Sequence, residues 1–545
     1  MRTANRWISG WLLLLAVACG SREPVPGPDS SSGPRLRAVS VASSAVVLLE
    51  GGTADVTFTV KDPEFAFTEL RLLGADGEAP DAFFLQDFRS GAEAGTYTAV
   101  LQDAGSGKSY ERQVCLAIVH VHPENGQEAF VASPFFTVSC QKTVSPEDGI
   151  DTGLPVVYVD TEGGKTIDSK EDYVNASLRI TGKGGYEGLD GTSCGIRGRG
   201  NTTWTWPKKP YLIKLDQKTS ILGMPKHKRW VLLANFMDRT LMRNMVSMKV
   251  STLTSLAWTP RCVPVELVLN GRHQGTYLMI EQVRVDKNRV NIVEMSPDDN
   301  EGEALSGGYL LELDFHYDNE IQWIDPNGRN NQWGSGVPFG IKAPDAEEIT
   351  QPQIAYIKNY VSETANTLYG TRFTDPDNGY AKYIDVDSFI DYWLVFELMC
   401  NHELGNPGSV YMHKDRGGKL VAGPCWDFDW GVLSFYTSPG EYDLVNGRAI
   451  WYDRLFQDPA FKERVRARFR ELLPQLETIP DYMDACRELL RESARLNFQM
   501  WNPADDRTQN GGNIINGDEN LTFDAAVDRL KSNYRKHLQV ISAKL

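Results

Sequence analysis

The order of hydrophobic and polar positions divides the chain into a first region of short strands and a longer second region. In residues 38–142, Asp55–Val60 alternates strictly between polar and apolar side chains, and Val114–Val121 and Phe135–Val138 are rich in strand-forming residues. Glycine-rich turns separate these runs, and the region lacks a clear helical spacing. Several short strands over about a hundred residues are typical of a sandwich, so we predict an immunoglobulin-like β-sandwich over 38–142.

The second region begins after a linker, residues 143–153, and changes from strand patterns to helical ones. Its strand-like runs are Leu178–Ile180, Tyr211–Leu215, Trp230–Leu233, Val263–Leu269, Tyr277–Ile280 and Gly308–Leu313. Its helical patterns are Phe389–Met399, Phe461–Leu473 and Phe523–Ile541. Strands followed by helices predict an α+β domain, which we expect to have two lobes and to occupy residues 154–545.

Composition narrows the class of protein without identifying its function. Hydrophobic residues make up 41% of the 545 positions and charged residues 23%, which is typical of folded multidomain proteins and not of disordered chains. The 72 acidic and 56 basic side chains give a formal charge of −16. A non-specific nucleic-acid binder needs a basic surface, so we expect no nucleic-acid partner.

The first residues have the pattern of a bacterial lipoprotein signal. Two arginines precede the apolar run Trp7–Ala18, which is too short to span a membrane comfortably, and small residues lead into Cys19. In this interpretation residues 1–18 are a signal peptide that is removed, and Cys19 carries a lipid that anchors the chain to a membrane. Residues 19–37 are rich in Pro, Ser and Gly, which predicts a flexible tether.

The residues after the cysteine predict where the protein is delivered. Gly20 and Ser21 do not include the Asp that would favour retention in the inner membrane. We therefore expect a lipoprotein of the cell envelope, at the outer membrane or the cell surface. An ordinary signal peptide cut near the same place is the alternative, and it would also export the protein.

A glycine-rich turn in the second region has the composition of a phosphate-binding loop. Gly195–Asn201 contains Arg199 and lies between two strand-like runs, and Lys209 and Lys214 follow it. Backbone N–H groups in such a turn, together with nearby cations, suit a triphosphate. The segment is neither a P-loop nor a dinucleotide fingerprint, because no Gly-Lys-Ser/Thr follows and no helix is predicted to begin there.

Two later segments supply carboxylates. Asp427 and Asp429 alternate with aromatic residues, so an extended segment would point both carboxylates to one face, as a hard cation such as Mg²⁺ requires. A turn with one capping and one exposed Asp is the structural alternative. Glu403 and Asn406 lie about 20 residues earlier, and Asn406 stands where a zinc-protease motif would need His. Phosphoryl transfer uses a carboxylate, an amide and a metal-binding Asp.

The order of these motifs resembles the CotH (spore-coat protein H) kinase family over about residues 150–500. The matching segments are Arg197–Asn201, Lys209–Leu215, Trp230–Asn244, Val268–Glu281 and Trp426–Asp429. The resemblance implies an atypical protein-kinase-like fold that binds ATP with Mg²⁺ or Mn²⁺. It also implies a phosphotransferase activity toward an extracytoplasmic protein, secreted or on the cell surface.

The resemblance assigns roles to the acidic and amide residues. Asp427 corresponds to the metal-binding Asp, with Asp429 beside it as a second ligand. Glu403 stands where the family has its catalytic Asp, and Asn406 or Ser409 would replace the usual Asn. A longer side chain displaces a carboxylate by about 1.5 Å, and such a displacement can lower a rate about 10²-fold.

The resemblance also assigns the nucleotide contacts. Lys214 is the expected phosphate-binding lysine, with Lys209 as the alternative, and Arg199 lies in the turn before them. Glu281 would either pair with that lysine or simply close its strand. We therefore predict a metal-dependent kinase, with two alternatives for Glu403: the backbone has adapted to it, or the protein is a weak or inactive kinase-like binder of glycans or surface polymers.

Overall fold

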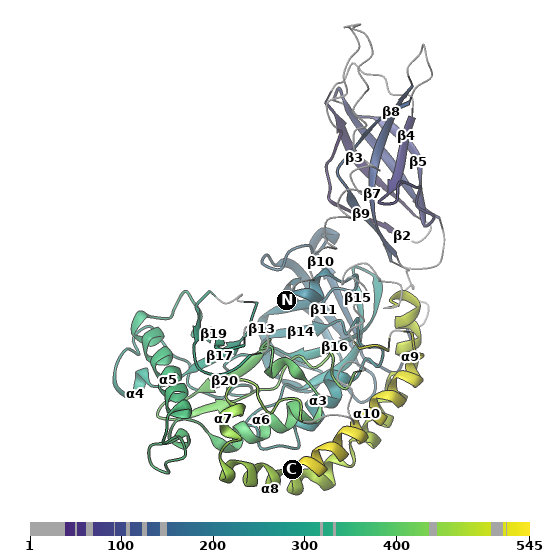
Figure 1. The fold of residues 1–545 in the computed structure, drawn as a ribbon. Helices are drawn as coiled ribbons and strands as arrows, with labels where there is room; N and C mark the ends of the chain where they lie inside the picture. Colours follow the sequence, from purple (N-terminus) through teal and green to yellow (C-terminus); the bar gives the residue numbers. More distant parts are fainter. Residues whose placement is uncertain are drawn as a thin grey trace, which may run out of the picture. The chain divides into compact units, whose positions relative to one another are not determined.

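The computed structural model describes residues 39–49, 52–61, 69–91, 93–104, 110–121, 128–141, 150–316, 320–330, 334–434, 444–502, 516–518 and 520–545. The chain divides into two compact units, residues 1–148 and 149–545 (Figure 1). The predicted signal peptide, Cys19, the tether and the first part of the predicted linker lie outside the described residues.

The first unit consists of two β-sheets that share one hydrophobic core. One sheet has the order β1-β3-β6-β5 and the other β2-β9-β7-β4, with β8 also paired to β7. The strands are β1 Val39–Val41, β2 Ala45–Leu49, β3 Thr53–Val60, β4 Glu69–Gly74, β5 Phe83–Ser90, β6 Thr96–Asp103, β7 Tyr110–Val121, β8 Glu128–Ala132 and β9 Phe136–Gln141.

Alternation along β3 explains how this core forms. Val56, Phe58 and Val60 are buried, and the residues between them are exposed. Leu116 on β7 belongs to the same core, so side chains from both sheets fill it. The predicted β-sandwich is thus present, and its immunoglobulin-like character stays a prediction.

The second unit begins with a closed barrel of seven strands. Their order is β10-β11-β12-β13-β14-β16-β15. The strands are β10 Val156–Thr161, β11 Val174–Thr181, β12 Leu189–Gly198, β13 Tyr211–Ile221, β14 Met224–Leu233, β15 Cys262–Leu269 and β16 Arg272–Glu281. One face of each strand packs into a core inside the barrel, which includes Ile196, Ile213, Trp230 and Tyr277.

The barrel corrects our expectation of two lobes. Five of the six predicted strands of the second region lie in the barrel, and Gly308–Leu313 lies outside it. The closure depends on β10 pairing in parallel with β15, for example Val156 with Glu266. Strand patterns give no information about a pairing so distant in the sequence. The second unit therefore has a barrel where we had expected one lobe of a two-lobed domain.

A second sheet and most of the helices follow the barrel. The sheet has the order β18-β19-β17-β20-β21, formed by β17 Tyr309–Leu313, β18 Gln322–Asp325, β19 Val337–Ala343, β20 Val410–Lys414 and β21 Leu420–Ala422. The longer helices are α3 Arg243–Ser251, α5 Gln351–Tyr369, α6 Val386–Leu398, α8 Pro459–Leu476, α9 Ile479–Met500 and α10 Phe523–Lys544. Short helical turns are η1 Glu162–Gly164, α2 Thr202–Thr205, α4 Gly302–Leu305, η2 Tyr380–Lys382, η3 His402–Leu404 and α7 Tyr452–Leu455.

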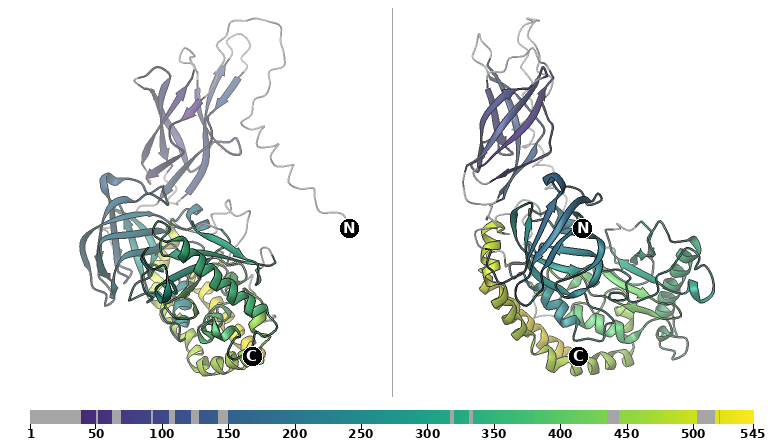
Figure 2. Two further views of the ribbon diagram at one scale, coloured as in Figure 1. Left: turned by 90° about the vertical axis from the view of Figure 1, so that its left-hand side faces the viewer. Right: turned by 180° about the vertical axis from the view of Figure 1, so that it is seen from behind.

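Burial explains the arrangement of these helices. All residues of α6 except Asp387 are buried, which fits its nearly continuous apolar sequence, and it forms the centre of the largest core. The amphipathic helices α8 and α10 run along the outside of this unit (Figure 2). The three predicted helices correspond to α6, α8 and α10, whereas α5 and α9 were not predicted. In the described part of the chain, the helices fall short of the combined length and apolar character needed to cross a membrane.

Candidate functional site

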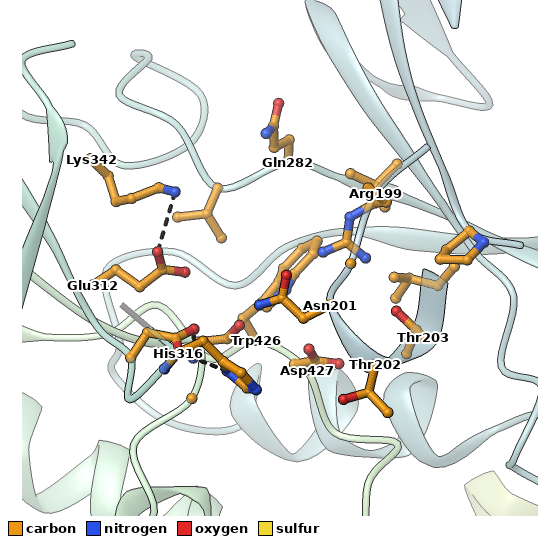
Figure 3. A pocket seen from close by; sticks show the side chains of 18 of the residues that line it. Arg199, Asn201, Thr202, Thr203, Gln282, Glu312, His316, Lys342, Trp426 and Asp427 are labelled. Atoms are coloured by element: carbon orange, nitrogen blue, oxygen red, sulfur yellow. Dashed lines mark hydrogen bonds and ion pairs between the residues drawn. The ribbon is translucent and has the colours of Figure 1, made fainter. Parts of the chain in front are cut away.

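A cavity of about 890 Å³ lies in the second unit and is lined by both of its β structures (Figure 3). Its walls include the ends of β12 and β14, the residues that follow β16, and residues of β17 and β19 from the second sheet. Residues of the loops 402–409, after α6, and 426–430, after β21, complete the lining. Strands from distant parts of the sequence therefore present side chains to one space.

The glycine-rich turn forms one wall of this cavity. It connects β12 to β13, which pair antiparallel, and its residues Arg199 to Thr203 line the cavity. Gly198 is required because a Cβ there would overlap the Trp204 ring, and Gly200 has φ +83° and lies against the Thr203 hydroxyl. The predicted turn is present, and it brings the Arg199 guanidinium to 5.7 Å from the Trp426 ring.

Several carboxyl side chains line the cavity, and we call four of them the cavity carboxylates. Asp427 and Asp429 come from the loop after β21, Glu403 from η3, and Asp314 directly follows β17. The first three were predicted as site residues. Asp314 was missed, although its position at the end of a predicted strand was a signal that it belongs to a site.

The pKa values show that these groups influence one another. Burial raises the pKa of Glu403 well above its ordinary value, and the charges of Asp427 and Asp429 raise it further, followed by that of Asp314. The pKa of Asp429 is also raised well above its ordinary value, first by burial and then by the charge of Asp427. Arg199 lowers the pKa of both aspartates, but burial still raises that of Asp427. The charges of these carboxylates therefore oppose one another's ionisation, and Arg199 offsets this only in part.

Side chains from two distant segments fix the loop that carries the aspartates. The Phe428 backbone N–H donates to Asn244 Oδ1 at 2.8 Å, and Arg243 Nε donates to the Val432 carbonyl at 2.8 Å. Asn516 accepts from the Gly431 N–H at 3.0 Å and donates to the Asp429 carbonyl at 3.1 Å. The Asn244 and Arg243 contacts explain why these motif residues, quoted for the resemblance, accompany the aspartates.

The two residues that could replace the family's usual Asn both line the cavity, as Glu403 does. Asn406 lines the cavity, and its backbone N–H donates to the His402 carbonyl at 3.1 Å. Ser409 also lines the cavity, and its backbone N–H donates to Asp314 Oδ2 at 3.4 Å. The structure thus leaves both alternatives at the site.

The donor set fits a hard divalent cation. The charge of Asp427 raises the pKa of Asp429, and Glu403 Oε2 is buried without a hydrogen-bond partner. Carboxylate oxygens are the protein ligands that Mg²⁺ prefers, and Mg²⁺ needs only one or two of them when phosphates and water supply the rest. Among the described residues, no group of three or more His, Cys, Asp or Glu side chains is arranged to hold a metal ion.

The two predicted lysines lie outside the cavity lining. Lys209 Nζ donates to the Trp204 carbonyl at 3.0 Å, and Lys214 is exposed on β13. Neither is among the described residues that line the cavity. Glu281 is buried at the end of β16 and pairs with Arg261 at 2.8 Å, not with Lys214. Of our two interpretations, Glu281 therefore closes its strand.

A different lysine–glutamate pair faces the cavity. Lys342 Nζ on β19 lies 3.2 Å from Glu312 Oε2 on β17, and both side chains line the cavity (Figure 3). Glu312 also accepts a hydrogen bond from the Tyr411 hydroxyl at 2.6 Å. Glu312 was recognisable as a charged residue inside an apolar strand, whereas β19 had no strand signal that we identified.

Comparison with known proteins adds one result to this geometry. A family model described as CotH kinase protein matches residues 196–541, which is more than half of the chain. The matched span includes all the cavity-lining residues except Glu171 and Tyr173. No curated protein and no solved structure matches the chain significantly.

Proposed function

The chain belongs to the CotH kinase protein family, and from this premise we propose that it is an exported atypical protein kinase. It transfers the terminal phosphoryl group of ATP to a secreted or cell-surface protein and uses Mg²⁺ or Mn²⁺. The observation that supports this proposal most directly is the cavity, in which the cavity carboxylates are accompanied by Arg199 and the Lys342–Glu312 pair. Phosphoryl transfer relies on positioning and on balancing the charge of the phosphates.

The carboxylates divide between two roles in this proposal. Asp427 and Asp429 would hold the cation, which would supply positive charge to offset that of the phosphates. Glu403 would orient the acceptor hydroxyl and receive its proton, since its Oε2 atom has no other hydrogen-bond partner. As the hydroxyl oxygen bonds to phosphorus, the bond from phosphorus to the bridging oxygen breaks and ADP leaves.

The cations of the cavity would bind the phosphates. Arg199 already acts on the charge of both aspartates, and Lys342 is 41% exposed, so it can contact a ligand without leaving Glu312. Arg199 was predicted for this role from the sequence. Lys342 takes the role for which we had expected Lys214 or Lys209, because those two side chains do not line the cavity.

A transfer assay tests the proposal directly. The full chain is incubated with radiolabelled ATP and Mg²⁺ or Mn²⁺, together with surface proteins of the same cell. We expect metal-dependent label on a protein acceptor, a strong loss of label in Glu403→Gln, and nucleotide binding in that variant close to that of the parent. An absence of label from the folded parent under both metals would contradict the kinase proposal.

A specific observation favours a second candidate function, that of a kinase-like binding protein. The rings of Trp206 and Trp430 stack at 6.1 Å beside the cavity, and Trp430 is 37% exposed. Paired indole rings suit the apolar faces of sugars. If glycans bind to the parent but phosphoryl transfer is absent, this function replaces the first.

The proposed location rests on the pattern around Cys19 alone. We propose that the mature chain is a lipoprotein of the outer membrane or cell surface, anchored through Cys19. Metabolic labelling with palmitate should mark the parent and not Cys19→Ala. Equal label in both proteins would contradict the anchor and would leave the kinase proposal unaffected.

A further inference from the structure

Three cations surround one tyrosine on the outer face of the barrel, next to the cavity. Arg229 Nη1 donates a hydrogen bond to the Tyr173 hydroxyl at 2.7 Å. The Arg197 guanidinium lies 5.1 Å and the Lys214 ammonium 5.8 Å from the centre of the Tyr173 ring. We call Tyr173, Arg197, Lys214 and Arg229 the cationic patch. All of its members except Lys214 also line the cavity.

The register of three barrel strands places these residues together. Gly195 of β12 pairs with Lys214 of β13, which pairs with Arg229 of β14, so all three positions share the outer face. A Cβ at Gly195 would lie 2.9 Å from Tyr173 Cδ1, so the missing side chain makes room for the ring. The three cations are therefore set by the sheet, and Tyr173, which directly precedes β11, packs against them.

The cations of the patch have weak acidic partners. The nearest carboxylate to Arg197 is that of Glu171, at 3.6 Å and on a side chain that is 86% exposed. Arg197 Nε is buried without a hydrogen-bond partner. Across the described residues, Arg229 forms no ion pair within 4.0 Å. Burial lowers its pKa, Arg284 and Arg197 lower it further, and Tyr173 and the more distant Asp345 raise it. This cluster of positive charge stands out in a chain whose formal charge is −16.

We propose that the cationic patch binds an acidic segment of the acceptor protein and holds it at the entrance to the cavity. The inference rests on the proposed function, because it names the chemistry of the acceptor. Arginine binds carboxylates through paired hydrogen bonds, and alternate residues of an extended chain are about 7 Å apart. Neighbouring strands are about 4.8 Å apart, so cations on β12 to β14 can meet several such carboxylates.

Two observations favour the acceptor over the nucleotide as the ligand of the patch. The phosphates already have Arg199, which acts on the aspartates, and Lys342 within the cavity, whereas the patch extends outward to the exposed Lys214. Tyr173 lies before residue 196, where the family match begins. The patch therefore includes a residue outside the matched region, as we expect of a surface that recognises an acceptor particular to this protein.

Direct binding to the full chain tests the proposal without requiring catalysis. The probes are a fluorescent Glu-rich peptide containing serine and a Lys-rich peptide of equal length, measured by anisotropy. We expect the parent to prefer the acidic peptide, with affinity that falls as salt screens the charges. Arg229→Gln should weaken this binding on the order of tenfold, the loss of one charge-assisted hydrogen bond. Lys214→Gln should weaken it about threefold, because Lys214 is exposed.

Controls separate this inference from the proposed function. Lys462→Gln removes one exposed charge from α8 and should leave peptide affinity unchanged. Calorimetric titration with ATP and Mg²⁺ should give the parental affinity in Arg229→Gln. A loss of nucleotide affinity with unchanged peptide affinity would assign the patch to the nucleotide and overturn the proposal, as would equal binding of both peptides by the parent. A failure of phosphoryl transfer alone would contradict only the proposed function.

Discussion

Two groups of charged side chains adjoin the segment 426–432, and they differ in whether their charges are balanced. In the first, which we call the sealed ion group, Arg243 pairs with Asp238 and with Asp518, and each side chain is at most 1% exposed. Arg243 also donates to the Val432 carbonyl. Each charge in this group has a partner, so the group can be sealed in the protein and hold the segment in place.

The second group, the cavity carboxylates, has the opposite property. Four carboxyl groups influence one another there, and Arg199 is the cation that lowers the pKa of both Asp427 and Asp429. Unbalanced charge raises the cost of keeping the carboxylates ionised, so a bound cation would remove that cost. The sealed ion group, whose charges are balanced, thus holds the segment 426–432 in place. The cavity carboxylates, whose charges are not balanced, mark where we expect a ligand to bind.

The largest expected effect comes from breaking the balanced group. Arg243→Met would leave Asp238 and Asp518 buried without their cation, and removing one partner of a buried pair costs about 3–5 kcal/mol. We expect a loss of that size in the free energy of unfolding, measured with urea. Arg464→Met is the matched control, because its pair with Asp387 is exposed and should contribute at most about 1 kcal/mol. Equal losses in the two variants would contradict the distinction.

Removing a charge from the cavity carboxylates should have the opposite sign. Asp427→Asn relieves repulsion with Asp429 and Glu403, so the metal-free protein should gain on the order of 1 kcal/mol of stability. The same variant should lose Mg²⁺-dependent nucleotide affinity by at least about a hundredfold, since a metal ligand is gone. Thermal unfolding and calorimetric titration measure the two effects. A variant that loses stability and binds nucleotide normally would refute the site.

Local patterns were sufficient to predict the elements and the aspartates. Alternation identified β3, and the apolar run 389–399 identified α6, because burial leaves a direct record in the sequence. Asp427 and Asp429 were recognisable because two carboxylates among aromatic residues are unusual in a core. These features depend on residues close together in the chain.

The rest of the site depends on pairings between distant strands. Asp314 and Lys342 reach the cavity only because β17 and β19 are neighbours in a sheet whose order no local pattern encodes. Lys214 was chosen for its closeness to the glycine-rich turn. Lys214 is exposed on the outer face of β13 and does not line the cavity, although its pairing partner Arg229 does. Sequence distance from a turn therefore did not predict distance from the site.

A moderate effect should distinguish the two lysines. Lys342→Met removes a cation from the cavity, so ATP affinity in the presence of Mg²⁺ should fall on the order of tenfold. Lys214→Met removes the same charge from outside the cavity and should leave ATP affinity within about twofold of the parent. Calorimetric titration of both variants measures this difference. The opposite result would restore Lys214 as the phosphate-binding lysine.

The smallest effect expected is a dependence of stability on pH that Mg²⁺ removes. Glu403 and Asp429 have pKa values raised above those of the unfolded chain, so the folded protein binds protons more readily than the unfolded one. Their contribution to stability is fully present below the unfolded pKa values, about 4, and is lost as pH rises through the folded values. Metal-free protein should therefore become less stable above about pH 4.

Saturating Mg²⁺ should oppose this loss, because a cation binds the ionised carboxylates and takes the place of the protons. Asp427→Asn, which removes one charge and one ligand, should weaken both the pH dependence and the response to Mg²⁺. Urea unfolding at several pH values, with and without Mg²⁺, measures these changes, and a parent whose stability rises over the same pH range would show that the cavity carboxylates are balanced after all.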